Sequence, residues 1–334
     1  SDVCSSDLTV KHVVVMTDRA HMPANSKIPN LLCYEELIAD KPGTLRWPDF
    51  DEYTASSLCY TSGTTGNPKG VLYSHRSTMI HAMMSSNGAV IPMNPDTTVL
   101  PVVPMFHANA WGLVYAAPIC GAKMVFPGPK LDGASIYELL DKEQVTLSAG
   151  VPTVWLALLD YCAQNKLKMS SVKRTLIGGS AVPISMIERF WKEHGAEVVQ
   201  GWGMTEMSPL GTTTRFNRGE RQLPDAERFA ITAKAGRPVY GCEMKIIDDA
   251  GNDLPSDGSV SGNLVVRGPW IVKGYMKGDG QGQFLKDDWF MTGDVCKIEK
   301  DGSVVITDRS KDVIKSGGEW ISSIDLEKIG RAHV

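Results

Sequence analysis

The chain has 334 residues, of which 43% are hydrophobic, and this is enough for one large domain or two smaller ones. Its formal net charge of −4 excludes the overall positive field with which many proteins bind nucleic acid. Its seven cysteines contain no Cys-x-x-Cys pair, which argues against a paired metal or redox site and is typical of reduced thiols in the cytoplasm.

The two ends of the chain look foreign to the rest. Asp2 to Leu8 reads DVCSSDL and is encoded by the DNA string GACGTGTGCTCTTCCGATCT, whereas Ile329 to Val334 reads IGRAHV and is encoded by the reverse complement. This string is a sequencing adapter. We therefore hypothesise that residues 1–8 and 329–334 are read-through artefacts around an open-ended fragment, and they are excluded from the fold prediction.

Residues 9–210 read as an α/β region. Lys11 to Met16 is typical of a buried strand, Leu31 to Asp51 of a connecting segment, Ser57 to Thr61 of a strand and Ser74 to Ser85 of a helix. Strand-like and helix-like segments then alternate, at residues 98–103, 110–120, 122–126, 135–143, 146–149, 151–164, 173–177, 185–194 and 197–200. This alternation predicts a doubly wound parallel sheet, in which ligands bind at the carboxyl ends of the strands.

The longest apolar stretch, Ala108 to Phe126, is interrupted by Asn109, Pro118 and Lys123. Since a membrane-spanning helix needs about 18 or more uninterrupted apolar residues, buried core is the better interpretation. After Gly211 the apolar runs shorten and turn residues become frequent. Residues 211–309 are therefore expected to form a small β-rich subdomain, with strands at residues 243–248, 261–267 and 304–308.

The stretch from Tyr60 to Gly70 reads YTSGTTGNPKG and concentrates hydroxyl groups, glycines and one lysine in a single loop. Such a loop presents several N–H and O–H donors to a polyphosphate, with a cation beside them. The alternative is an ordinary surface turn. The letters do not fit the Gly-x-x-x-x-Gly-Lys-Ser/Thr pattern, which argues against a P-loop kinase. The candidate phosphate-binding residues are Thr61, Ser62, Gly63, Thr64, Thr65, Gly66 and Lys69.

Three further strings carry candidate chemistry. Gln200 to Glu206 reads QGWGMTE, in which the glutamate could hold Mg²⁺ and the glycines let a flat base approach the backbone; the alternative is a turn with a solvated Glu. Asp294, after Thr292-Gly293, could accept the two ribose hydroxyls or simply close a β-turn. Asp308 to Trp320 is rich in charge and contains two glycines, as in a hinge or a solvated turn.

In this order, the strings resemble the acyl-adenylate-forming superfamily from about Ser57 to Glu327. Val103 to Trp111 (VPMFHANAW) and Ser316 to Ser323 (SGGEWISS) look like bacterial medium- and long-chain fatty acid–CoA ligases. The resemblance implies an adenylate-forming large domain and a two-step reaction that uses ATP, Mg²⁺ and coenzyme A. A carboxylic acid becomes an acyl-adenylate with release of pyrophosphate, and the thiol of coenzyme A then displaces AMP.

The resemblance also implies roles for individual residues. Thr61 to Lys69 would hold the β- and γ-phosphates, with Thr61 and Glu206 at the metal and Thr205 at the α-phosphate. The adenine would lie between Gly178-Gly179-Ser180 and Gln200-Gly201-Trp202, and the ribose would bind Asp294 and Arg309. The hinge would be Lys311, and the residues that approach the nucleotide or the pantetheine arm in the second step would be Lys315, Gly318 and Trp320.

The resemblance places His107, Ala108 and Trp111 at the mouth of the acyl pocket, as wall and gate; the alternative for a lone histidine beside aromatic residues is a packed core position. Relatives that activate amino acids carry an Asp where this chain has His107. An α-amino acid would therefore leave its ammonium unpaired in an apolar pocket, at a cost of several kcal/mol. This argues against amino-acid substrates.

The family's adenylation lysine lies beyond Glu327, in a lid domain of which residues 310–328 are expected to be the hinge and the beginning. This chain is therefore expected to adenylate poorly, although its parent gene would encode a ligase. The motifs leave open a ligase for short or sulfur-containing acids such as methylthiopropionate, because pocket depth sets chain length. A non-catalytic nucleotide-binding fragment, a homodimer and a peripheral membrane contact also stay open.

Overall fold

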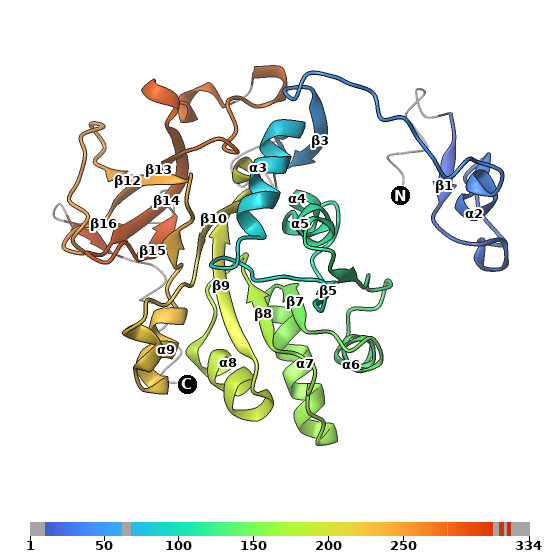
Figure 1. Ribbon diagram of the computed structural model, residues 1–334. Coiled ribbons are helices and arrows are strands. Elements are labelled where there is room, and N and C mark those ends of the chain that lie inside the picture. The colour runs from blue at the N-terminus through green and yellow to red at the C-terminus, as the bar shows by residue number, and fades with distance from the viewer. Residues whose placement is uncertain (1–10, 62–67, 279, 310–313, 317–318, 322–334) are drawn as a thin grey trace. The chain divides into compact units, whose positions relative to one another are not determined.

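The computed structural model describes residues 11–61, 68–278, 280–309, 314–316 and 319–321 (Figure 1). Its internal contacts divide the chain into two compact units, Ser1–Asp51 and Glu52–Val334. The sequence-based boundaries at residues 210 and 309 stay predictions. Among the described helices, none is both long and apolar enough to cross a membrane.

The first unit contains a two-stranded parallel sheet of β1 (Val13–Val15) and β2 (Leu31–Cys33). The short helix η1 (Arg19–His21) lies between these strands and α2 (Tyr34–Ile38) follows them. The expected strand at Lys11 to Met16 therefore forms, but the expectation that it is buried is wrong, since Val14 is 38% exposed. Two strands of three residues provide too little surface to bury both of their faces.

The second unit is built on a seven-stranded sheet with the order β11-β10-β9-β8-β7-β5-β6. Neighbouring strands from β6 to β9 are parallel, whereas β10 and β11 are antiparallel additions at one edge. The strands are β5 (Thr98–Pro101), β6 (Lys123–Met124), β7 (Leu147–Gly150), β8 (Arg174–Ile177), β9 (Glu197–Gly203), β10 (Leu210–Thr213) and β11 (Arg237–Pro238). The prediction of a doubly wound parallel sheet is confirmed.

Both faces of this sheet are buried, because successive strand residues point to opposite sides. Val99 and Leu176 belong to one core cluster, while their neighbours Leu100 and Ile177 belong to the other. The first cluster also includes residues of α5 (Leu113–Ile119), and Ile80 and Met84 of α3 (His75–Ser85) pack against it. The second includes residues of α6 (Gly133–Lys142), α7 (Pro152–Asn165), α8 (Ile184–Arg189) with its π-helical continuation η2 (Phe190–His194), and α9 (Asp225–Thr232).

Local sequence explains where several of these helices begin. Ser74 and Ser77 form a reciprocal capping box at the start of α3, and the Asp132 side chain accepts a hydrogen bond from Ser135 N at the start of α6. Pro152 stands in the first turn of α7, where its missing N–H is not needed. The stretch from Ala108 to Phe126 forms α4 (Ala108–Trp111), α5 and β6 and contributes buried residues to the core, as expected.

A hairpin of β3 (Ala55–Tyr60) and β4 (Gly70–Ser74) precedes α3. After β11 the chain forms a four-stranded antiparallel sheet of β12 (Glu243–Ile247), β13 (Gly262–Arg267), β14 (Phe290–Ile298) and β15 (Val304–Arg309). The small β-rich region is thus confirmed. A further pair follows, β16 (Ile314–Ser316) with β17 (Glu319–Ile321).

The sequence analysis missed β14, although it is the longest strand among the described residues. Thr292-Gly293-Asp294 lies within this strand and not in a β-turn. Gly293 has φ of 80°, and the register between β13 and β14 shifts at this point, as at a β-bulge. The glycine that reads as a turn signal therefore marks an irregularity inside a strand.

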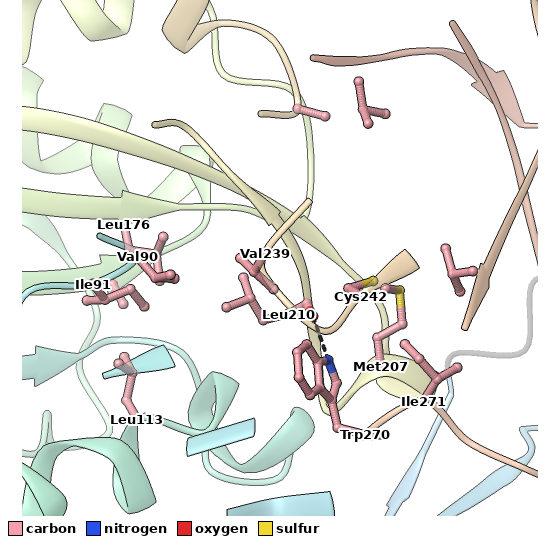
Figure 2. Packing of buried hydrophobic residues seen from close by; sticks show 14 of the residues in the cluster. Val90, Ile91, Leu113, Leu176, Met207, Leu210, Val239, Cys242, Trp270 and Ile271 are labelled. Atoms are coloured by element: carbon pink, nitrogen blue, oxygen red, sulfur yellow. Dashed lines mark hydrogen bonds between the residues drawn. The ribbon is translucent and has the colours of Figure 1, made fainter. Parts of the chain in front are cut away.

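The two sheets of the second unit share one core. Trp270 is buried and its indole N–H donates to the carbonyl oxygen of Leu210 on β10 at 2.9 Å (Figure 2). Met207 and Cys242 pack in the same cluster, which continues to buried residues of β13, β14 and β15. The β-rich region is thus fixed against the edge of the large sheet, where the candidate ligand-binding residues lie.

Candidate functional site

The β3–β4 hairpin fixes both ends of the Gly/Thr loop. Thr61 N donates to Lys69 O at 2.9 Å, and Lys69 N donates to Thr61 Oγ1 at 3.3 Å. The loop therefore begins and ends at adjacent points. The candidate residues Ser62, Gly63, Thr64, Thr65 and Gly66 lie outside the described residues, so their predicted phosphate contacts stay predictions.

Glu206 lies in a short helix, η3 (Thr205–Met207), directly after β9. It is only 5% exposed, so the alternative of a solvated glutamate is wrong. Its backbone is fixed on two sides, because Tyr73 Oη donates to Thr205 O at 2.6 Å and Val272 N donates to Glu206 O at 2.8 Å. A buried carboxylate needs partners, and Tyr275 Oη donates to Glu206 Oε1 at 2.5 Å.

Tyr275 connects this carboxylate to the loop lysine. The Lys69 ammonium lies 4.8 Å from the centre of the Tyr275 ring and donates to Gln283 Oε1 at 2.9 Å. Tyr275 Oη lies 3.3 Å from the same Gln283 oxygen. Burial raises the pKa of Tyr275, and its hydrogen bond with Glu206 raises it further, so the hydroxyl stays protonated and can donate.

Tyr275 and Gln283 were not predicted from the sequence. They lie far from Lys69 and Glu206 along the chain, in a glycine-rich stretch without a catalytic motif. The pairing of Val71 with Tyr275 in an isolated β-bridge brings the stretch to β4. An aromatic residue followed by an amide eight positions later gives no sequence signal of its own.

The predicted adenine-binding residues gather at the ends of two neighbouring parallel strands. Ile177 at the end of β8 is in register with Gln200 in β9, so Gly178 and Gly201 lie side by side. A β-carbon on Gly178 would stand 2.9 Å from Gly201 O and 3.3 Å from the Trp111 ring, which leaves room only for glycine. Gly179 and Ser180 follow in exposed positions, with Gly179 at φ of 83°.

The buried Gln200 side chain shows whether an adenine base fits at this end of the sheet. Its side chain is buried, and Gln200 Oε1 has no hydrogen-bond partner among the residues that the structure describes. A buried amide oxygen without a donor is costly, and the amino group of a purine would supply one. The residues present at this end of the sheet therefore fit an adenine base.

Asp294 lies beside the same strands. It is 3% exposed, and Trp202 Nε1 donates to Asp294 Oδ2 at 3.0 Å, which joins two residues that are 92 positions apart in the sequence. Arg309 in β15 is the register partner of Asp294 in β14. Lys315 and Trp320 are register partners in the β16–β17 pair, whereas Lys311 and Gly318 lie outside the described residues.

The predicted acyl-site residues lie in an unusual backbone conformation. Ala108, Asn109, Ala110 and Trp111 have φ of 45°, 54°, 50° and 58°, and Gly112 continues at 74°, so α4 is a left-handed turn. Asn109 Nδ2 donates to Ser57 Oγ at 2.9 Å, which ties the turn to β3. His107 is exposed, so the alternative of a packed core histidine is wrong, while Ala108 is buried.

A buried histidine that the sequence did not indicate supports this turn. His81 Nε2 accepts a hydrogen bond from Leu210 N at 3.2 Å, and a β-carbon on Gly112 would stand 2.7 Å from His81 Cε1. Burial lowers the pKa of His81 to about 3, so the ring is neutral at pH 7 and can accept this bond.

The donor set fits a Mg²⁺ ion that is shared with phosphates. No group of three or more His, Cys, Asp or Glu residues forms a metal site within the described part of the chain. Magnesium typically binds through one or two carboxylates together with substrate phosphates and water, and not in an all-protein cage. One buried carboxylate, Glu206, near the lysine of the predicted phosphate-binding loop meets that requirement.

Known proteins resemble this chain in sequence and in structure. The sequence profile of the AMP-binding enzyme family matches residues 4–276. A 3-methylmercaptopropionyl-CoA ligase of Ruegeria lacuscaerulensis is 51% identical over 97% of this chain and 60% of its own length. A medium-chain-fatty-acid–CoA ligase of Ectopseudomonas oleovorans is 50% identical over 97% of this chain and 59% of its own length.

Among solved structures, an O-succinylbenzoate coenzyme A synthetase from Bacillus subtilis, in complex with ATP and magnesium ion, superposes with a TM-score of 0.72. It is 25% identical, and the superposition covers 91% of this chain and 60% of that chain. The present chain spans about 60% of the length of the curated relatives that it matches.

Proposed function

This chain belongs to the AMP-binding enzyme family, and we propose that the protein of which it forms part converts a medium- or long-chain fatty acid into its coenzyme A thioester. ATP and coenzyme A would be the co-substrates and Mg²⁺ the metal. The observation that carries the proposal is the connection of the buried Glu206 carboxylate to the Lys69 ammonium through Tyr275 and Gln283. This connection supports the proposal because it brings the carboxylate proposed for the metal and the ammonium proposed for phosphate into one site.

The reaction would proceed in two steps. A carboxylate oxygen of the fatty acid attacks the α-phosphorus of ATP, the bond to the β-phosphate oxygen breaks, and pyrophosphate leaves. The coenzyme A sulfur then attacks the acyl carbon, AMP leaves with its oxygen, and the thiol proton is released. Positioning and charge stabilisation would dominate the first step.

At the phosphate end, Lys69 and the loop donors would hold the β- and γ-phosphates, and Thr205 the α-phosphate. Glu206 and Thr61 would hold Mg²⁺, which supplies charge neutralisation when bound. At the base, Gln200 would accept from the adenine amino group, with Gly179, Ser180, Gly201 and Trp202 around the ring. The ribose hydroxyls would bind Asp294, which Trp202 holds in place, and Arg309.

At the acyl end, His107, Ala108 and Trp111 would form the wall and mouth of the pocket. Trp111 also lies against Gly178, so the acyl and adenine ends share a boundary. Lys311 would be the hinge to a lid domain, and Lys315, Gly318 and Trp320 would serve the thiolation step. These roles and the domain boundaries are parts of the proposal.

A second substrate class has direct support. A 3-methylmercaptopropionyl-CoA ligase and a medium-chain-fatty-acid–CoA ligase are 51% and 50% identical to this chain, so sequence identity does not separate them. A short sulfur-containing acid is therefore the second candidate substrate. A non-catalytic nucleotide-binding fragment is the alternative for the 334-residue chain itself.

The deciding experiment measures AMP release by the full-length protein from the source gene, with and without coenzyme A, against acetate, octanoate, palmitate and 3-methylmercaptopropionate. We expect octanoate or palmitate to give the highest kcat/KM. A preference for 3-methylmercaptopropionate would support the second candidate. Absence of acid-dependent AMP release from a folded, ATP-binding protein would refute the ligase function.

We further propose a cytoplasmic location. The support is that Cys33, Cys59, Cys120, Cys162, Cys242 and Cys296 are all free thiols and most are buried. Burial raises the pKa of Cys242 to about 12, which keeps this thiol protonated and unreactive. A homodimer and a peripheral membrane contact stay predictions from the sequence.

A further inference from the structure

Two charged groups at the phosphate end are joined by two neutral side chains. The Lys69 ammonium binds Gln283 Oε1, that oxygen lies 3.3 Å from Tyr275 Oη, and Tyr275 Oη donates to Glu206 Oε1. Among the ion pairs of the residues that the structure describes, none joins Lys69 to Glu206, although both contact Tyr275. A flexible lysine near a buried carboxylate would otherwise be strongly attracted to it.

The Gln283 amide is held in one orientation. Its oxygen faces the Lys69 ammonium, which can only donate, and its nitrogen donates to Met291 O at 3.3 Å. Both ends of the amide are thus used, and β14 supplies the second partner. The Gln283 side chain is therefore attached to β14, which fixes the oxygen that Lys69 contacts.

Gly280 lets this segment approach the other two residues closely. A β-carbon at Gly280 would stand 2.7 Å from the Tyr275 ring and 3.0 Å from Lys69 Nζ, and its φ is 64°. Only glycine adopts this conformation at this distance without displacing the lysine. The ammonium is consequently enclosed between the Tyr275 ring, Gly280 and the Gln283 oxygen.

We propose that Gln283 is a positioning residue that keeps Lys69 out of a direct ion pair with Glu206, so that the ammonium stays available for phosphate and the carboxylate for Mg²⁺. This inference rests on the proposed function of the site. A direct Lys69–Glu206 pair would neutralise both groups and would have to break before Mg²⁺ and ATP could bind. A neutral amide oxygen holds the cation with a weaker bond, which a phosphate oxygen can replace.

The test compares Gln283→Met with Gln281→Met in the 334-residue chain. Methionine keeps the length of Gln283 and removes its oxygen. Gln281 belongs to the same short helix, η6 (Gln281–Gln283), but it is exposed and its side-chain amide donates to Gly278 O, which makes it a matched control. Isothermal titration calorimetry measures the affinity for Mg²⁺–ATP and, separately, for AMP, which lacks the two phosphates assigned to Lys69.

We expect Gln283→Met to weaken Mg²⁺–ATP binding about tenfold and to raise the Mg²⁺ concentration needed for half-maximal binding. AMP binding should change less than about twofold, which also shows that the variant is folded. Gln281→Met should bind both nucleotides like the unsubstituted chain. In a Lys69→Gln background, Gln283→Met should have no further effect on Mg²⁺–ATP binding. The ammonium that Gln283 keeps apart from Glu206 is already absent in that background.

Three outcomes would overturn the inference. The first is that Gln283→Met binds Mg²⁺–ATP as tightly as the unsubstituted chain or more tightly, and the second is that its affinities for Mg²⁺–ATP and for AMP fall equally. The third is that Gln283→Met lowers the affinity for Mg²⁺–ATP as much in the Lys69→Gln background as in the unsubstituted chain. If the unsubstituted chain binds neither nucleotide, the proposed function fails for this chain and the inference fails with it. Failure of the proposed function is thus seen as absence of nucleotide binding by the unsubstituted chain. Failure of the inference alone is seen as nucleotide binding without the expected effect of Gln283→Met.

Discussion

The phosphate end and the acyl end of the candidate site are built in different ways. At the phosphate end, four side chains from distant segments meet through hydrogen bonds, and Lys69 and Gln283 are 214 positions apart. At the acyl end, five consecutive residues from Ala108 to Gly112 adopt left-handed backbone angles. The geometry of the phosphate end depends on hydrogen bonds between side chains, whereas the geometry of the acyl end depends on the conformation of one backbone segment.

The difference predicts where each end is vulnerable. A left-handed conformation costs about 1–2 kcal/mol for each residue other than glycine, so the turn persists only because its surroundings hold it. Ala108 and Ala110 are buried, and Asn109 bonds Ser57. We therefore expect substitutions at the acyl end to change the stability of the fold, and substitutions at the phosphate end to change ligand affinity.

The largest effect should come from Gly112→Ala. The new β-carbon would stand 2.7 Å from His81 Cε1 in a backbone with φ of 74°. The clash and the backbone strain together should lower the free energy of unfolding by about 3 kcal/mol, measured by urea denaturation. Gly88→Ala is the matched control, since nothing lies within 4 Å of its β-carbon position. Equal stability of the two variants would contradict a strained turn.

The sequence could predict the parallel sheet, because buried strands have local signatures, and it supplied candidate site residues whose roles stay predictions. It could not predict the left-handed turn, since alanine and tryptophan do not favour that conformation. Tyr275 and Gln283 were missed because only tertiary contacts bring them to Glu206 and Lys69. Strand β14 was missed because Gly293 reads as a turn residue.

The second prediction concerns the phosphate end, and uses Glu206→Gln. The amide oxygen can still accept from Tyr275, so the fold should be retained, but the charge that is proposed to attract Mg²⁺ is lost. We expect Mg²⁺–ATP binding to weaken about 10- to 100-fold, with little change in AMP binding or in the unfolding midpoint. Glu193→Gln, at an exposed position, is the control. If Glu206→Gln lost much stability but kept its affinity for ATP, the expectation that substitutions at the phosphate end change ligand affinity would be wrong.

Asn109→Ala should have a smaller effect on the acyl end. It removes the 2.9 Å bond from Asn109 Nδ2 to Ser57 Oγ, and alanine tolerates the left-handed region less well than asparagine. We expect a loss of about 1–2 kcal/mol in the free energy of unfolding. Asn109→Gly removes the same bond without the backbone strain, so it should lose less. If both variants are as stable as the unsubstituted chain, the bond does not hold the turn.

The smallest effect should be a pH dependence confined to the acyl end. Burial lowers the pKa of His81 to about 3 from an ordinary value of 6.5, so the unfolded chain binds a proton that the folded chain rejects. The stabilising contribution is therefore complete above pH 6.5 and is lost progressively as the pH falls toward 3.

Between pH 7.5 and pH 5.5 this loss should amount to about 1 kcal/mol. Urea unfolding of the unsubstituted chain and of His81→Asn at pH 7.5 and 5.5 measures it. Asparagine does not titrate, although its shorter side chain does not reach Leu210 N as His81 Nε2 does. The variant should be less stable at pH 7.5 because the smaller side chain leaves space beside Gly112, but its stability should fall less between the two pH values. A parallel fall in both proteins would show that His81 does not supply the acid sensitivity, and that the left-handed turn is held independently of its protonation.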